Sequence, residues 1–492
     1  MASRLASLLF TIPDDVWHLV VEFATHSMRQ VLRLQQIDSH FRTIMRNPLM
    51  VTHLEVEVND LSHVRRMKSL GFGVHYLKAQ ALPASAALDL LACTPNVRGL
   101  NLSHGNFDST AFQQAIVLLP QLQQLNVSFC RQLVRIQALP DTLRELDVMY
   151  CTRLVELPPM ANLQKLDASH CSRLSVLPAL PALVSANLGY GLTAINAMDT
   201  LRHLKIGQAS VPDSRTLTRL DSLCLVDCNF EQEWFCAPLT NLTALTLVFV
   251  SYRRAHDLSA LSMLTGLQKL HLETGVCDDN LASLESLVRV KSLFVASELI
   301  SDDGLGSIAK MRALETLYIN NCRRKQITDQ GLCVLAALPQ LRSLHLSECY
   351  GVAHRMQGLS ALTQLQALCI DNDHDAREAS RWPVTPEEVL IDQWAHEDDF
   401  EPLTALPNLT TLELLYCSVL SLRWLNRIPR LDVLVVKGCD LTLTGLWDLV
   451  PCNIASVVLG ERARATLGDD VEMFRQRMSP HALVFESEEG VF

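Results

Sequence analysis

Hydrophobic residues recur along most of this chain in one order, which has the form L-x-x-L-x-L-x-x-C. PQLQQLNVSFC at 120–130, RALETLYINNC at 312–322 and PNLTTLELLYC at 407–417 are three examples. Eighteen copies lie between Val51 and Ile454, and their first positions are 18 to 27 residues apart with one exception. A copy this short cannot bury its hydrophobic face alone, so the copies must stack on one another as a solenoid.

The order of residues within a copy predicts its local structure. The last two leucine positions alternate with other residues, which is typical of a β-strand that turns two side chains into a core. Copies that begin from 122 to 201 are only 18 to 21 residues long, which predicts extended or 3₁₀ segments opposite the strand. Later copies, such as ISDDGLGSIAKMRAL at 300–314, place Asp residues before an apolar stripe and predict helices there.

Cysteine occupies the ninth position of eight copies. A metal or redox ladder is one interpretation of this column. The other, which we favour, is a small buried thiol that packs beneath the turn, because glycine takes the same position in other copies. The eight residues are Cys130, Cys151, Cys171, Cys228, Cys322, Cys349, Cys417 and Cys439.

The repeat resembles that of the leucine-rich-repeat family, and the later copies are similar to the cysteine-containing subclass that is common in F-box proteins. The resemblance implies an α/β fold, a leucine-rich-repeat solenoid curved as a horseshoe with a parallel β-sheet on its concave face. We assign residues 49–462 to the repeats, as 18 to 19 copies, and residues 463–492 to a C-terminal cap or tail.

The exceptional gap is 44 residues long and separates Leu365 from Leu409. A degenerate repeat that starts at Pro386 would divide it into 21 and 23 residues. Alternatively, TPEE at 385–388 is typical of a helix start within an inserted segment. Residues 371–401 hold eleven Asp and Glu against two Arg, so most of the chain's negative charge lies in this stretch.

Residues 1–48 carry no repeat and show two apolar stripes at helical spacing. The segment resembles the F-box in its Ile-Pro start, its first apolar helix and its late Asn-Pro. A helical cap that covers the edge of the first strand is the alternative, and the two roles are compatible. By the resemblance, the segment would bind a Skp-type adaptor through Ile12, Pro13, Val16, Leu32, Leu34 and Ile37.

Two columns of side chains should line up on the concave face, because one repeat position in stacked copies falls in one line. The fifth position is Asn or Asp in five successive copies, and the eighth position holds a ring in the same five. Rings on a rigid surface are typical of protein-binding sites, although L-N-L and L-D-L are frequent in such repeats and rings also pack on one another. The predicted partner-binding residues are His104, Phe129, Tyr150, His170, Tyr190, Asn126, Asp147 and Asp167.

The composition and the motifs of the chain narrow the classes of function that it can have. The net charge of −11 argues against a nucleic-acid partner. No apolar run reaches about 18 residues, the length of a transmembrane helix, and the N-terminal stretch is too short for a signal peptide. We therefore expect no membrane partner, and a cytosolic or nuclear protein whose 15 cysteines are reduced. No nucleotide-binding, nucleophile or zinc motif occurs, so we predict no catalytic residue, no metal site and no cofactor.

These observations predict a non-catalytic protein-interaction protein. The resemblance to F-box proteins implies the substrate-recognition subunit of a cullin–RING ubiquitin ligase of the SCF type. Its partners would be a protein substrate on the concave face, the adaptor and a cullin. The alternative is a leucine-rich-repeat scaffold or regulatory adaptor with no link to a ubiquitin ligase.

Overall fold

The computed structural model of the chain divides into two compact units, residues 1–220 (unit 1) and residues 221–492 (unit 2). The segment 1–48 and its six predicted adaptor-binding residues lie outside the residues that the structure describes. Those residues are 55–57, 75–80, 83–92, 94–189, 199–207, 217–227, 238–248, 258–273, 275–320, 326–349, 356–371, 397–417, 419, 421–439, 441–478 and 482–486.

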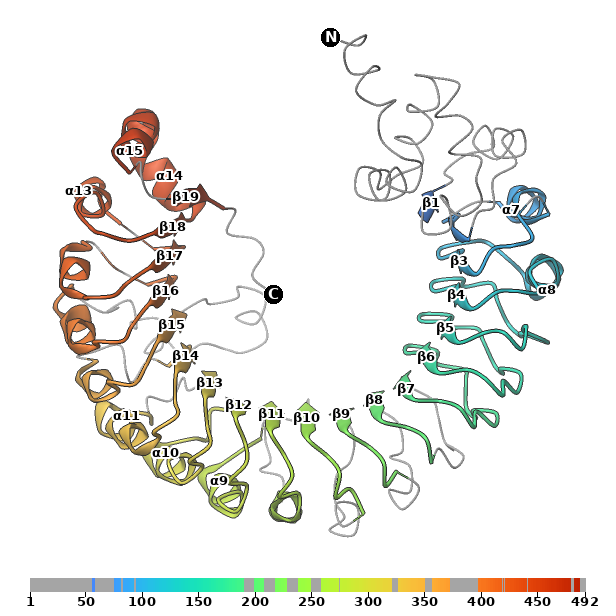
Figure 1. Cartoon of the computed structure of the whole chain (residues 1–492), viewed down its shortest axis with the longest axis horizontal. Helices are drawn as coiled ribbons and strands as arrows, with labels where there is room; N and C mark the ends of the chain where they lie inside the picture. Colours follow the sequence, from blue (N-terminus) through green and yellow to red (C-terminus); the bar gives the residue numbers. More distant parts are fainter. Residues whose placement is uncertain are drawn as a thin grey trace, which may run out of the picture. The chain divides into compact units, whose positions relative to one another are not determined.

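Unit 1 is built on a parallel sheet in which strands that follow one another in the sequence are neighbours (Figure 1). The second leucine position of each copy is in register with the next, so that Leu100, Leu125, Leu146 and Leu166 form one row. The strands are β1 (Glu55–Glu57), β2 (Tyr76–Lys78), β3 (Gly99–Asn101), β4 (Gln124–Asn126), β5 (Glu145–Asp147), β6 (Lys165–Ala168), β7 (Ser185–Leu188) and β8 (His203–Gly207).

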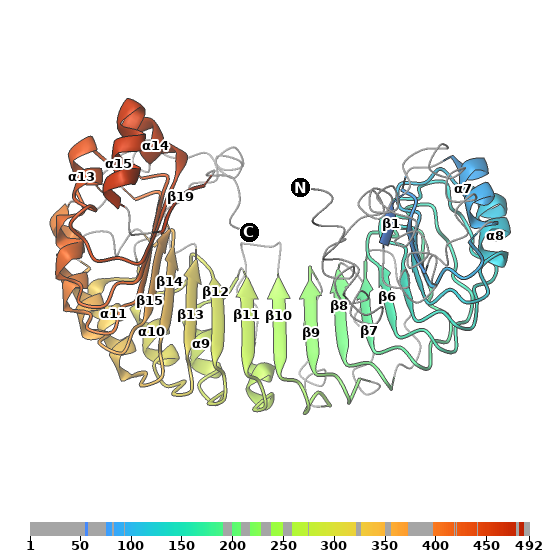
Figure 2. The same cartoon turned by 45° about the horizontal axis from the view of Figure 1, so that its top comes forward.

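Unit 2 repeats this arrangement with longer strands, which lie side by side and point the same way (Figure 2). Its leucine row runs through Leu270, Leu293, Leu317 and Leu344 and continues to the last strand. The strands are β9 (Ser222–Val226), β10 (Ala244–Val248), β11 (Lys269–Glu273), β12 (Ser292–Ala296), β13 (Thr316–Asn320), β14 (Ser343–Ser347), β15 (Ala367–Asp371), β16 (Thr411–Leu415), β17 (Val433–Lys437), β18 (Ser456–Leu459) and β19 (Ala482–Phe485).

The connecting segments lie on the outer face of each unit, and their structure follows copy length as predicted. Between β4 and β8 the described residues contain no helix, only turns and bridges such as Arg135 to Glu156. The α-helices are α7 (Ala84–Leu91), α8 (Ser109–Val117), α9 (Asp278–Ser283), α10 (Asp302–Ile308), α11 (Asp329–Val334), α13 (Leu443–Trp447), α14 (Glu461–Leu467) and α15 (Val471–Met478). The 3₁₀ helices are η3 (Ser259–Met263), η4 (Leu335–Ala337), η5 (Gln357–Ala361), η7 (Glu397–Ala405), η8 (Arg423–Arg427) and η9 (Gly468–Asp470).

The strand pairing excludes a degenerate repeat at 371–401. Strand β15 pairs directly with β16, and Leu368 lies opposite Leu412, so no strand of another copy stands between them. The extra residues therefore form an insertion between two copies, as the alternative interpretation held. The helix start expected at 385–388 lies outside the described residues.

Two further differences concern the ends of the sheet. The copies align Leu54 with Leu77, but β1 pairs Val56 with Leu77, so the first copy is shifted by two residues. A shift of two keeps the period-two pattern of a strand, which is why hydrophobicity alone does not fix it. Beyond the last predicted copy, β18 pairs in parallel with β19, so the segment 463–492 supplies another strand of the sheet.

The core consists of the leucine rows and, beneath the turns that follow several strands, buried thiols. The Sγ of Cys151 donates to the carbonyl of Val127 at 3.2 Å, and that of Cys171 to the carbonyl of Val148 at 3.0 Å. Each thiol thus links two copies, which confirms the packing interpretation where the structure describes it. The buried members of the column are Cys130, Cys151, Cys171, Cys349, Cys417 and Cys439.

On the outer face, the Asp that begins α9 and the Asp that begins α10 each connect successive copies. The Asp278 carboxylate accepts the N–H of Ser301 at 2.9 Å and its hydroxyl at 2.6 Å. Asp302 accepts the same two groups of Thr328 at 2.8 and 2.6 Å. Ser301 and Thr328 cap their own helices, so the Asp orients a capping residue as well as joining two copies.

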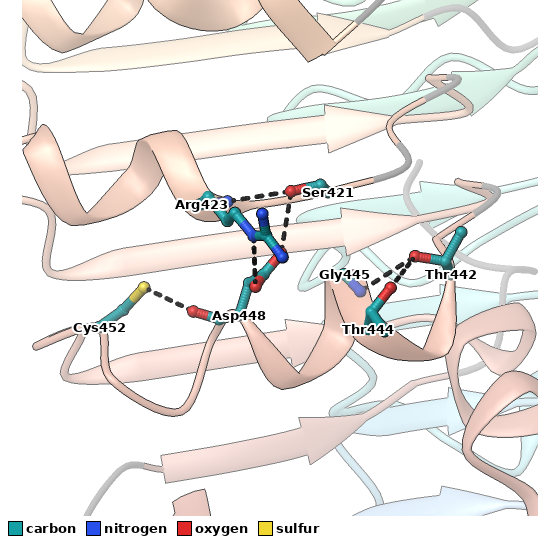
Figure 3. Close-up of polar contacts among 7 residues, drawn as sticks. All are labelled: Ser421, Arg423, Thr442, Thr444, Gly445, Asp448 and Cys452. Carbon is teal, nitrogen blue, oxygen red and sulfur yellow. Dashed lines mark hydrogen bonds and ion pairs between the residues drawn. The ribbon is translucent and has the colours of Figure 1, made fainter.

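A similar polar cluster joins two C-terminal copies (Figure 3). The carboxylate of Asp448 accepts the hydroxyl of Ser421 at 2.9 Å and the Nε of Arg423 at 3.3 Å. The main-chain carbonyl of Asp448 accepts the Sγ of Cys452 at 3.3 Å, and the hydroxyl of Thr442 caps α13. Because Asp448 ends α13 while Arg423 begins η8, the cluster holds the outer segments of neighbouring copies together.

We predict that Gly304→Ala destabilises the protein whereas Gly306→Ala, in the same helix, does not. A methyl group at Gly304 would overlap the carboxylate of Asp278 and displace it from Ser301. A methyl group at Gly306 meets nothing within 4 Å, so it adds helix propensity worth about 1 kcal/mol. Thermal unfolding of both variants checks this, and equal melting temperatures would contradict the role assigned to Asp278.

We also predict that the free energy of unfolding falls between pH 9 and pH 11. Burial raises the pKa of the Cys130 thiol from 9.0 to about 11 and that of Cys171 to about 12. The unfolded chain therefore loses these protons at lower pH than the folded chain, and folding becomes less favourable as the pH rises. Urea unfolding across this range should show a smaller slope for Cys130→Ala with Cys171→Ala, and an unchanged slope for Cys333→Ala at an exposed position.

Candidate functional site

Four of the five predicted rings form one continuous strip along unit 1. His104, Phe129, Tyr150 and His170 follow strands β3 to β6, and each has a left-handed backbone, with φ values of 59°, 60°, 56° and 58°. This repeated conformation turns every ring to the same side of the strand ends. Tyr190, the fifth ring, lies outside the described residues, and its place in the strip stays a prediction.

The rings are stacked face to face. Their centroids are 4.5 Å apart from His104 to Phe129, and the planes differ by 8°. The next centroid distances are 4.7 Å from Phe129 to Tyr150 and 4.2 Å from Tyr150 to His170. Anchoring a partner through open ring faces would require those faces to be exposed, but neighbouring rings cover the faces of the inner rings. Phe129, Tyr150 and His170 are half-buried, His104 is exposed, and the ring edges form the accessible surface.

The Asn and Asp column holds the turns that carry the rings. The Oδ1 of Asn126 accepts the N–H of Ser128 at 2.9 Å, and the Oδ1 of Asp147 accepts that of Met149, also at 2.9 Å. Side chains that bond two residues onward favour a turn over continued strand. The column therefore ends each strand where the left-handed residue must follow, which is a structural role beside the predicted partner-binding one.

The same column carries two carboxylates on adjacent strands, Asp147 and Asp167. Asn126 donates to Asp147 at 2.8 Å, and Asn187 donates to Asp167 at 2.8 Å, so the outer amides support the two inner carboxylates. Burial, and then the charge of Asp167 on the adjacent strand, raises the pKa of Asp147. A hollow of about 420 Å³ lies over these residues and extends across strands β2 to β7. The predicted partner-binding residues Asn126, Asp147 and Asp167 thus line one hollow, and the rings follow the ends of the same strands.

The sequence interpretation missed a second row of rings, in unit 2. His271, Phe294, Tyr318 and His345 occupy the fifth position on β11 to β14, where they lie directly opposite one another. The centroids of His271 and Phe294 are 4.0 Å apart, and those of Tyr318 and His345 are 5.1 Å apart. The signal was a ring at the fifth position of four successive copies, but only the eighth position was expected to form a strip.

The end of this second row contains a Cys and a His but not an activated nucleophile. The Sγ of Cys369 lies 3.7 Å from the Nε2 of His345. Burial, together with the charge of Glu413, raises the pKa of the Cys369 thiol, and burial lowers the pKa of His345. Both shifts favour the neutral thiol and imidazole over the thiolate–imidazolium pair that nucleophilic cysteines use.

Within the described ranges, no group of three or more His, Cys, Asp or Glu residues could hold a metal ion. Across the same ranges, none of the helices has the length and apolar character needed to cross a membrane.

Neither protein-family models nor curated proteins match this chain. Three solved structures are similar at 18% sequence identity. A leucine-rich-repeat protein of Leptospira interrogans covers 81% of this chain and 99% of its own, with a TM-score of 0.49. An internalin of Listeria monocytogenes covers 77% and 94%, with a TM-score of 0.38. TLR13, in a complex with ssRNA13, covers 86% and 63%, with a TM-score of 0.45.

The repeat and the strand pairing of this chain, rather than these similarities, establish its leucine-rich-repeat fold. The exclusion of a nucleic-acid partner stays a prediction from net charge.

We predict that Phe129 and Tyr150 are energetically coupled. Each stacked pair should contribute about 0.5–1.5 kcal/mol beyond the burial of its area. A double-mutant cycle with Phe129→Ala and Tyr150→Ala, measured by urea unfolding, should therefore give a coupling of that size. Phe129→Ala combined with Phe294→Ala, in the other ring row, is the additive control. Additivity of the first pair would show that the stack contributes nothing to stability.

Proposed function

We propose that this chain is a non-catalytic protein-interaction protein that binds a protein partner through the ring strip and hollow of unit 1. The strip is rigid, because its rings stack on one another and their turns are held by bonds to the Asn and Asp column. A rigid surface loses little conformational freedom when a partner binds, which favours affinity.

The observation that carries this proposal is the choice of rings at a backbone position that favours glycine. A left-handed conformation costs about 1–2 kcal/mol for a residue with a side chain, and Gly438 occupies the corresponding position in unit 2 with a φ of 64°. Four successive rings in unit 1 accept this cost. Asp227, Glu348 and Tyr416 of unit 2 also accept this cost, so the distinctive feature of unit 1 is that a ring stands there in four successive copies. We propose that contacts of these ring side chains explain that choice.

We propose in addition that residues 1–48 bind a Skp-type adaptor, which would make the chain a substrate receptor of an SCF-type ubiquitin ligase. The support is the sequence resemblance to the F-box and the place of the segment directly before the repeats. The repeats of unit 1, which directly follow the adaptor-binding segment in the sequence, would then present the substrate. A leucine-rich-repeat scaffold or regulatory adaptor without a ligase is the second candidate.

Substitutions in the strip should weaken the binding of the protein partner by about tenfold or more each, since a few aromatic anchors commonly dominate an interface. The partner is first identified by affinity purification of the full chain, and its Kd is then measured for Phe129→Ser and Tyr150→Ser. Val117→Ser, at an exposed position of the outer helix α8, is the matched control. Unchanged affinity with a lowered melting temperature would show that the rings only stabilise the fold.

The ligase proposal is tested by adaptor recovery. Full chains carrying Ile12→Asp with Leu32→Asp should lose adaptor and cullin peptides in affinity purification and mass spectrometry, because buried charges oppose an apolar interface. The variant Phe129→Ser should keep them and lose the substrate instead. If the unaltered chain recovers no adaptor, the scaffold hypothesis replaces the ligase hypothesis. The proposed role of the ring strip does not depend on this result.

A further inference from the structure

The second row of rings lies on the open face of the sheet in unit 2. Along β11 and β13 every second residue is buried, and His271 and Tyr318 alternate with core leucine and isoleucine residues. The four rings are half-buried by one another, and their edges remain accessible. Neighbouring strands lie about 4.8 Å apart, so the row extends roughly 14 Å across four strands. It forms a ridge as long as four or five residues of extended peptide.

The ridge stands above its surroundings because small side chains flank it. On the three strands β12 to β14, the residues two positions before and two positions after each ring carry no charge and no ring. A segment that crosses the strands can therefore approach the ring edges from above without displacing a long side chain. The flanking residues are Ser292, Ala296, Thr316, Asn320, Ser343 and Ser347.

Charge is confined to the ends of the ridge, and the far end is acidic. Cys369 and Glu413 continue the row on β15 and β16, and Asp371 lies beside them on the same open face. Among the described residues no Lys or Arg forms a salt bridge with Glu413. Because its neighbour Cys369 favours the neutral thiol, the carboxylate of Glu413 is the charge that a partner meets in this row.

We infer that His271, Phe294, Tyr318, His345 and Glu413 form a second docking surface, for an extended protein segment with a basic side chain opposite Glu413. Apolar or aromatic side chains of the segment would lie along the ring edges. A Lys or Arg would place its stem over Cys369 and pair its cationic group with the carboxylate. This surface is independent of the strip in unit 1, since it belongs to other strands and another repeat position.

A protein segment fits this row better than a nucleic acid does. Bases stack on flat ring faces, but in this row only the first pair of rings is stacked and the next two pairs are tilted by 33° and 31°, so the rings offer no common plane for successive bases. Phosphates also require cationic neighbours, whereas the row ends in carboxylates. A cationic side chain gains from the carboxylates at the end of the row, because they attract it.

The test is selection from a displayed library of random peptides on the immobilised full chain. Enriched peptides are synthesised, and their Kd values for the unaltered chain and its variants are measured by fluorescence anisotropy. We expect enrichment of Lys or Arg together with apolar residues. Tyr318→Ser should weaken these peptides about tenfold, and Glu413→Gln should weaken them less and reduce their salt dependence. Phe129→Ser, in the other strip, should leave them unchanged.

Several outcomes would overturn the proposal. These are a selection without enrichment, peptides whose Kd values are unaffected by Tyr318→Ser and Glu413→Gln, and peptides sensitive only to Phe129→Ser. Oligouridine RNA is tested in parallel, and its binding with loss in Tyr318→Ser would replace the protein segment with a nucleic acid. Glu413→Gln removes the charge of a half-buried side chain and keeps its size, so it stays informative if thermal melts show that Tyr318→Ser unfolds. Failure of this proposal would not bear on the role proposed for the ring strip of unit 1.

Discussion

The structure depends on the register between neighbouring copies. Each strand pairs in parallel with the next so that leucine lies opposite leucine, and each leucine row buries surface worth about 1.5–3 kcal/mol per side chain. Once the leucines are aligned, every other repeat position is aligned as well. Thiols then reach the carbonyls of the preceding copies, and the Asp at one helix start reaches the cap of the next. Any repeated side chain thus becomes a continuous row.

Both ring rows follow from this constraint, at different positions of the repeat. In unit 1 the rings occupy the left-handed residue after the strand, and in unit 2 they occupy the strand itself. Each row has the order His, Phe, Tyr, His, from His104 to His170 and from His271 to His345. Stacking makes the row of unit 1 stiff and leaves ring edges and polar ring atoms accessible, whereas in unit 2 only His271 and Phe294 are stacked and the other pairs are tilted. Such a surface favours directional contacts with a protein over general adhesion.

The sequence was sufficient to predict the structure where the hydrophobic period and the chemistry of the residues agreed. The leucine pattern predicted the strands, copy length predicted which outer segments are helical, and the ninth-position cysteines that the structure describes proved to be buried. It was insufficient where two registers satisfy the same pattern, as at Val56, and where an acidic insertion resembles a weak copy, as between β15 and β16. The sequence also could not predict that the rings stack, because a repeated residue type does not reveal that the backbone at Phe129 is left-handed.

The central claim is that the partner contacts the ring strip of unit 1, and site-specific photo-crosslinking tests it most directly. A photoreactive phenylalanine is placed at position 129, in the strip, or at position 117 on the outer face, where Val117 is 72% exposed. The account predicts that the partner is crosslinked from position 129 and not from position 117. Crosslinking from position 117 alone would contradict it and assign the interface to the outer face of the solenoid.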